Sequence, residues 1–136
     1  PAHPLRYAAE AFLAGGGPSS RIQDLRRVRG IGYIPDQIYA EQLNYLPTIR
    51  ADLRPHLMSS SINVQLHMTL QGRGVCILPK FIAAQHPTLV RLLPSDIDIT
   101  RSFWMITHED MGRLEKVRAC ANFLADQVRT KIAALA

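Results

Sequence analysis

Short apolar runs and longer helix-compatible segments alternate along most of this chain. The apolar runs predict strands over residues 4–9, 30–34, 56–60, 75–78, 89–93 and 102–107. Between them, the remaining segments predict helices over residues 8–14, 21–28 and 38–46, and a helical turn over residues 81–85. Gly15 and Pro47 stop the first and third of these helices. The alternation predicts an α/β fold in which a mostly parallel or mixed sheet has helices on both faces.

The segment over residues 62–70 has two readings. Alternate positions are apolar, which by period alone indicates a strand: Ile62, Val64, Leu66, Met68 and Leu70. The flanks favour a helix, because Ser59, Ser60 or Ser61 can serve as the N-cap and Gly72 lies just past the end. We interpret this segment as a helix, since both of its ends fit and it spans the gap to the next strand.

The end of the chain carries a long amphipathic helix. One face of that helix is apolar and consists of Leu114, Val117, Ala121, Leu124, Val128 and Ile132. Glu109 and Asp110 precede it, at the end where the helix dipole favours negative charge. We expect this apolar face to require a partner, because such side chains are costly to leave in water.

Length and composition fit one ordered domain. The chain has 136 residues, of which 47% are hydrophobic and 20% are charged, and this argues against a disordered tail. Its apolar runs are far shorter than the roughly 20 residues that span a membrane, and no signal peptide is visible. Pro1 is not a natural start, so we expect the chain to be cut from a longer protein. Cys76 and Cys120 form no CxxC motif, which favours two buried thiols over a disulfide and is compatible with the cytoplasm.

The formal net charge is +5, and the densest basic cluster is Arg21, Arg26, Arg27 and Arg29. Such a cluster can be a nucleic-acid patch or a solvated helix face. We favour the helix face, because the segment has no interleaved aromatic residues on which bases could stack.

Catalytic and metal-binding patterns are weak. None of the histidines pairs with another histidine or a cysteine at metal-ligand spacing, so we expect no metal. No serine lies in a Gly-x-Ser-x-Gly elbow, and Asp96 and Asp98 fit a solvated turn better than an acid–base pair. The Gly72-Arg73-Gly74 string follows a helix and precedes a strand, the reverse of the order in a dinucleotide site. We therefore expect neither an enzyme nor a cofactor.

Two segments have the character of ligand-facing positions. In the first, a predicted strand ends in a polar loop that contains Tyr33, Ile34, Pro35 and Asp36, and ligands of open α/β sheets bind at such strand ends. In the second, Ser59, Ser60 and Ser61 follow a strand and open a helix, where hydroxyls and free backbone N–H groups suit an anion. The alternatives, an ordinary turn and an N-cap, carry about equal weight on these residues alone.

The string from Gly72 to Pro79, GRGVCILP, resembles the G-x-G-[IV]-x-x-[LV]-P signature of the LysR-type effector domain. Upstream, residues 7–13 are similar to the family's segment around "A-s-P-a-Y-L", and Gln23-Asp24-Leu25 with Gly30-Ile31 is similar to its "dL…h..i". Downstream, residues 103–107 and 114–128 resemble its terminal strand and helix. The resemblance covers nearly the whole chain, but Glu10 stands where the family usually has proline.

The resemblance implies one lobe of a two-lobed, periplasmic-binding-protein-like (type 2) fold. Residues 1–100 would form the effector-binding lobe, and residues 101–136 a strand and long helix that return to the missing partner lobe. The family's N-terminal winged helix-turn-helix is absent, so DNA would be bound only by the longer parent protein. In the family the effector binds between the lobes, and the resemblance maps this lobe's side of the cleft onto Ala9, Glu10, residues 33–36 and residues 59–61.

The sequence therefore predicts a cytoplasmic effector-sensing domain of a LysR-type bacterial transcription factor, in a homo-oligomer, with a small and anionic effector. Two other classes stay open. A solute-binding lobe of a transport system would be indicated by an export signal on the parent gene. A small hydrolase that uses an isolated serine would be indicated by labelling with a reactive-serine probe.

Overall fold

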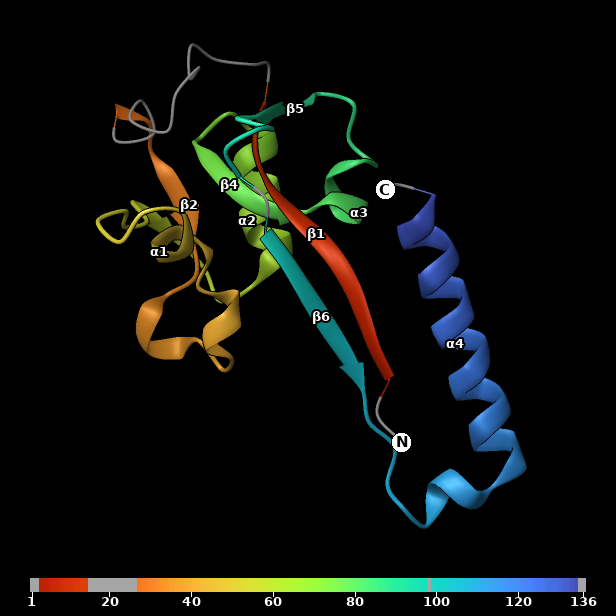
Figure 1. Cartoon of the computed structure of the whole chain (residues 1–136). Coiled ribbons are helices and arrows are strands. Elements are labelled where there is room, and N and C mark those ends of the chain that lie inside the picture. Colours follow the sequence, from red (N-terminus) through yellow and green to blue (C-terminus); the bar gives the residue numbers. More distant parts are fainter. Residues whose placement is uncertain (1–2, 15–26, 98, 135–136) are drawn as a thin grey trace.

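A computed structural model describes residues 3–14, 27–97 and 99–134 (Figure 1). Its centre is a six-stranded mixed sheet in the order β3-β2-β4-β1-β5, with β6 also paired to β1. The strands are β1 (His3–Ala14), β2 (Gly30–Gly32), β3 (Leu57–Met58), β4 (Val75–Pro79), β5 (Leu89–Leu92) and β6 (Ile99–Met105). The helices are α1 (Tyr45–Ile49), α2 (Ile62–Leu70), α3 (Lys80–Ala83) and α4 (Glu115–Ala133). The predicted mixed α/β sheet is confirmed.

Strand β1 is the longest strand and is antiparallel to all three of its neighbours. It pairs with β4 along one edge, whereas its other edge pairs first with β6 and then with β5. The predicted helix over residues 8–14 is therefore wrong. Ala9 and Ala11 belong to one buried cluster and Phe12 to the other, so both faces of this segment pack inside the molecule. That burial, with sheet pairing on both edges, overrides the helix propensity of an alanine-rich run.

Strands β2, β3 and β4 are parallel to one another, and β4 is buried along its whole length. Val75 and Ile77 contribute to the cluster on one face of the sheet, and Cys76 and Leu78 to the cluster on the other. Full burial on both faces is expected of an interior strand, here parallel to β2 and antiparallel to β1, that is covered on each side.

Helix α2 covers one face of the sheet and confirms the helical reading of residues 62–70. Gly72 follows it with a φ of +67°, the left-handed conformation that glycine adopts readily at a helix end. On the other face, the predicted helix over residues 38–46 is wrong, because the chain forms short 3-10 turns and then α1. Pro47 lies inside the first turn of α1, where its missing N–H removes no helical hydrogen bond. The predicted helix over residues 21–28 lies largely outside the described residues.

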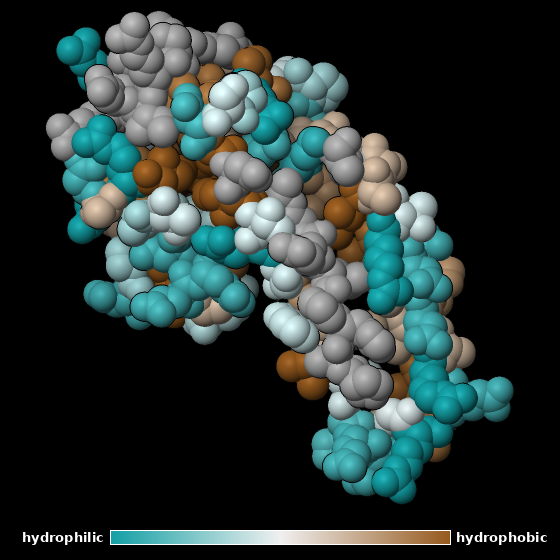
Figure 2. All heavy atoms as spheres, in the orientation of Figure 1, coloured by the Kyte–Doolittle hydropathy of each residue, from teal (hydrophilic) through white to brown (hydrophobic). Residues whose placement is uncertain are grey.

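The first part of β1 and β6 form a two-stranded ribbon, from His3 opposite Met105 to Ala9 opposite Ile99. The ribbon extends away from the rest of the sheet, and α4 runs back beside it with its C-terminal end near α3 (Figure 1). Figure 2 shows apolar residues gathered over the sheet, while α4 presents mostly polar residues on this side. Within the described residues, no helix combines the length and the apolar character needed to cross a membrane.

Candidate ligand-binding site

One edge of the sheet collects the segments in which the sequence predicted a ligand site. Because β2 is parallel to both β3 and β4, their carboxyl ends lie at this common edge. The tyrosine loop (Tyr33, Ile34, Pro35 and Asp36) follows β2, and the serine turn (Ser59, Ser60 and Ser61) follows β3. Ala9 pairs with Pro79 at the end of β4, so β1 reaches the same edge. We call it the carboxyl edge; the chain brings all three predicted segments to it.

Ser59 anchors the serine turn through both its backbone and its hydroxyl. The Ser59 N–H donates to the Gly32 carbonyl oxygen at 3.0 Å, and the Ser61 N–H donates to Ser59 Oγ at 3.1 Å. Ser61 occupies the N-cap position of α2, but its hydroxyl makes no capping hydrogen bond, and Ser60 is exposed. The turn therefore presents two serine side chains next to the first N–H groups of α2, which have no partner within the helix. That combination of donors suits an anionic or strongly polar group.

The tyrosine loop lies beside the serine turn at the end of the neighbouring strand. Tyr33 is half-buried and packs against the core cluster beneath it, while Pro35 and Asp36 are exposed in a short 3-10 turn. The Gln37 N–H closes this turn on the Ile34 carbonyl oxygen at 3.0 Å. The loop thus offers a fixed aromatic side chain and an exposed carboxylate toward solvent.

Ala9 and Glu10 lie beneath this surface. Ala9 is fully buried in the core, and the Glu10 side chain is only 7% exposed. The Glu10 carboxylate forms an ion pair with Arg91 of β5, at 2.8 Å between Oε1 and a guanidinium nitrogen. Both residues thus lie at the carboxyl edge, but Ala9 packs in the core and the Glu10 carboxylate is already paired with Arg91.

Sequence reasoning missed a buried polar residue at the same edge, Gln65 of α2, which is 1% exposed. Its Nε2 donates to the Ser59 carbonyl oxygen at 2.8 Å, and its Oε1 accepts from Cys76 Sγ at 3.5 Å. Gln65 also lines, together with Tyr33, a small cavity of about 10 Å³. In the sequence, Gln65 is only one of the polar residues that alternate with apolar ones along α2, and nothing local indicates which groups it contacts.

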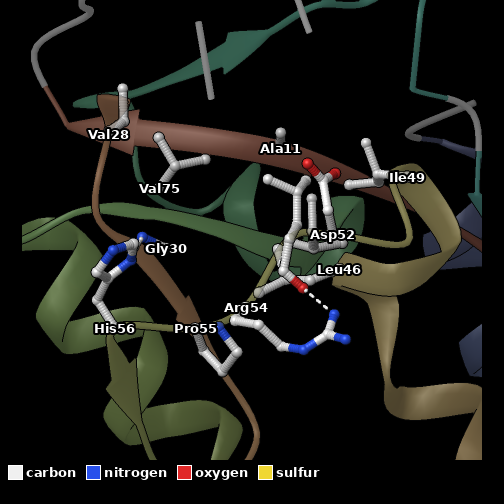
Figure 3. Close-up of a pocket in the computed structure, with 12 residues that line it drawn as sticks. Ala11, Val28, Gly30, Leu46, Ile49, Asp52, Arg54, Pro55, His56 and Val75 are labelled. Atoms are coloured by element: carbon white, nitrogen blue, oxygen red, sulfur yellow. Dashed lines mark hydrogen bonds between the residues drawn. The ribbon is translucent and has the colours of Figure 1, made fainter. Parts of the chain in front are cut away.

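A larger hollow of about 300 Å³ lies elsewhere, at the amino ends of β2 and β4 on the face opposite α2. Val28 and Val75 lie on one side of it and Leu46 and Ile49 on the other (Figure 3). Its opening carries His56, whose Nδ1 accepts the Gly30 N–H at 3.2 Å. None of the predicted ligand-binding residues lines this hollow. Its walls come from separate apolar segments, which leave no local motif in the sequence.

Among the residues that the structure describes, no group of three or more His, Cys, Asp or Glu side chains is placed to hold a metal ion.

The family model described as the LysR substrate binding domain matches residues 4–129. The chain belongs to this family. The regulatory domain of CrgA, a LysR-type regulator from Neisseria meningitidis, aligns with a TM-score of 0.74 and 19% identity, covering 94% of this chain and 68% of that one. The regulatory domain of HypT from Salmonella typhimurium aligns with a TM-score of 0.62 and 20% identity, covering 99% and 66%. No curated protein sequence matches the chain.

These structural likenesses, at such low identity, show a shared fold. The chain spans about two thirds of the two regulatory domains. It also aligns with a longer CrgA chain, with a TM-score of 0.74 and 18% identity, and covers 47% of that chain. The family match confirms the resemblance and the periplasmic-binding-protein-like fold, and identifies an effector-binding domain of the LysR type. The alternative of a transport component finds no support.

Proposed function

We propose that this domain senses a small anionic or polar molecule at the carboxyl edge of its sheet. The observation that carries the proposal is the convergence there of the serine turn and the tyrosine loop, at the ends of two adjacent parallel strands. The N–H groups that open α2 favour negative charge. Lys80 follows β4 at the same edge, and the net charge of +5 also attracts anions. Asp36 opposes this attraction locally, but its side chain is exposed in the tyrosine loop and its charge is screened by water.

We further infer that the effector alters DNA binding by a longer, homo-oligomeric regulator in the cytoplasm, and that the domain is not an enzyme. DNA contact would come from a helix-turn-helix outside this chain. The relative DarR from Vibrio fischeri was solved in complex with DNA, and the HypT domain with bound bromide. Membership of the LysR family supports this role for the chain.

The test is a titration of the isotope-labelled chain with succinate, followed by amide NMR shifts at constant ionic strength. Succinamide is the uncharged control. We expect succinate to shift the amides of residues 60–64 at millimolar concentration, and succinamide to shift them much less. The variant Ser60→Ala/Ser61→Ala should weaken this response severalfold, whereas Ser95→Ala, at an exposed serine in another turn, should not.

Equal shifts with both compounds, or an unchanged response in the double variant, would refute the site. Shifts that cluster instead around His56 would relocate ligand binding to the hollow at the amino ends of β2 and β4.

A further inference from the structure

We infer that Gln65 is a positioning residue that fixes the serine turn to the core of the sheet. The inference deepens the proposed function, on which its relevance to ligand binding rests. An amide side chain that is 1% exposed needs partners, because a buried polar group without them is costly. The Gln65 amide has a hydrogen-bond partner on each side, Ser59 of the serine turn and Cys76 of β4.

The two partners give the amide a defined orientation. The Ser59 carbonyl oxygen can only accept, so the group facing it at 2.8 Å is Nε2. Oε1 then faces Cys76 on β4, which is itself buried. The Cys76 Sγ lies 3.5 Å from Oε1 and 3.6 Å from the Ile77 carbonyl oxygen, so the two oxygens share its single S–H donor. One side chain thus connects the turn that opens α2 to a fully buried strand of the sheet.

This contact reaches the part of the turn that the backbone leaves unsupported. The Ser59 N–H is held by Gly32, and its hydroxyl by the Ser61 N–H. Its carbonyl, which sets the direction of the peptide leading to Ser60, is held by Gln65. Gln65 also lines a small cavity with Tyr33, so the same residue borders both ligand-facing segments.

The decisive comparison is between Gln65→Met and Thr69→Val. Methionine keeps the length of the side chain and removes both hydrogen bonds. Thr69 is equally buried one turn later on α2, and its Oγ1 donates to the Gln65 main-chain oxygen at 2.8 Å. Its hydroxyl also contacts the Cys76 thiol, so Thr69→Val perturbs the same helix and the same cysteine while the contact between Gln65 and Ser59 stays in place. The first readout needs no ligand: hydrogen exchange of the Ser61 amide, measured for both variants at matched global stability.

We expect exchange of the Ser61 amide to accelerate about tenfold in Gln65→Met and to change less than twofold in Thr69→Val. The tenfold figure corresponds to about 1.4 kcal/mol, the size of one lost hydrogen bond, here the bond to the Ser59 carbonyl oxygen. Succinate affinity should fall about tenfold in Gln65→Met only. Equal exchange rates in the two variants would overturn the positioning role. Failure of the unmodified chain to bind succinate would sink the proposed function, while the exchange comparison would still decide the role of Gln65.

A measurement on the unmodified chain covers the case in which Gln65→Met does not fold. The Gln65 Nε2 protons should exchange with solvent far more slowly than those of exposed glutamines such as Gln71. Exchange as fast as at Gln71 would contradict the inference.

Discussion

The ion pair between Glu10 and Arg91 gives a sharp test of how the carboxyl edge is built. Arg91 pairs with Phe12 across β1 and β5, so Glu10 is its diagonal neighbour on the same face of the sheet. The Glu10 side chain is 7% exposed and that of Arg91 41% exposed, with 2.8 Å between the charged atoms. Replacing Arg91 by methionine would leave a carboxylate in the core without its counter-charge.

The exposed fractions set the size of the effect. Breaking a fully buried ion pair costs about 3–5 kcal/mol, whereas exposed pairs contribute about 0.2–1 kcal/mol. Here the carboxylate is buried and the guanidinium is partly in water, so solvent screening discounts the buried figure. We expect Arg91→Met to lower the free energy of unfolding by about 2 kcal/mol. The double variant Glu10→Leu/Arg91→Met should recover most of that loss, because it removes the unpaired charge as well.

The assay is urea unfolding followed by circular dichroism, arranged as a double-mutant cycle. The matched control is Arg129→Met on α4, which breaks an exposed ion pair with Asp126 at 3.0 Å and should cost under about 0.5 kcal/mol. The reasoning is refuted if Arg91→Met costs no more than Arg129→Met. It is also refuted if the effects of the two single substitutions simply add in the double variant.

Four further predictions rest on named residues. Ser59→Ala should lower the free energy of unfolding by about 1 kcal/mol, because Ser59 Oγ accepts the Ser61 N–H. Ser61→Ala should lower it by less than half as much, because the Ser61 hydroxyl makes no capping hydrogen bond. A larger loss for Ser61→Ala in urea unfolding would contradict this hydrogen-bond arrangement. Burial raises the pKa of Cys76 from 9.0 to about 12, so at pH 8 the folded chain should react with a thiol reagent at the exposed Cys120 only. Labelling of Cys76 before the chain unfolds would contradict this. Because the pKa of Cys76 is higher in the folded than in the unfolded chain, the free energy of unfolding should fall as pH rises from about 9 toward 12. A free energy of unfolding that stays flat over that range in a Cys120→Ser background would contradict the pH dependence. Finally, the exposed side chains of Phe123 and Leu124 on α4, with Leu114 at its N-cap, should drive self-association at high concentration, and Leu124→Lys should reduce it. A strictly monomeric species in sedimentation at millimolar concentration would refute this.

The sequence predicted best those elements whose local signals agree. Helix α2 has serines before it and Gly72 after it, and the run from Val75 is apolar at every position, so the helix and β4 followed from the chain itself. The predictions failed where tertiary packing decides. Nothing local distinguishes the alanine-rich half of β1 from a helix, because its partners on β4 and β5 lie far along the chain, the nearest pair being Phe12 and Cys76. Cys120 was expected to be buried but is exposed on α4.

The candidate site, too, was predictable only where local sequence signals decide its structure. The tyrosine loop and the serine turn follow strands, and their meeting at one edge follows from parallel pairing, which the alternation of elements predicts. The roles of Glu10 and Gln65 do not follow, because each is defined by a partner on another element. Glu10 pairs with Arg91 of β5, and Gln65 links the serine turn to Cys76 of β4. A sequence read alone shows only a charged residue in a strand and an amide in a helix.

The distribution of burial separates the sheet from the final helix. Every residue of β4 is buried, whereas Ala125 is the one buried residue among the described positions of α4. A hollow of about 630 Å³, lined by Phe81, Phe103, Val128 and Ile132 among others, also lies between α3 and the end of α4. Protein interiors are close-packed, so a helix with so little burial gains little stability from its contacts within this chain. The sheet therefore carries the core, and α4 has apolar surface left for packing beyond it.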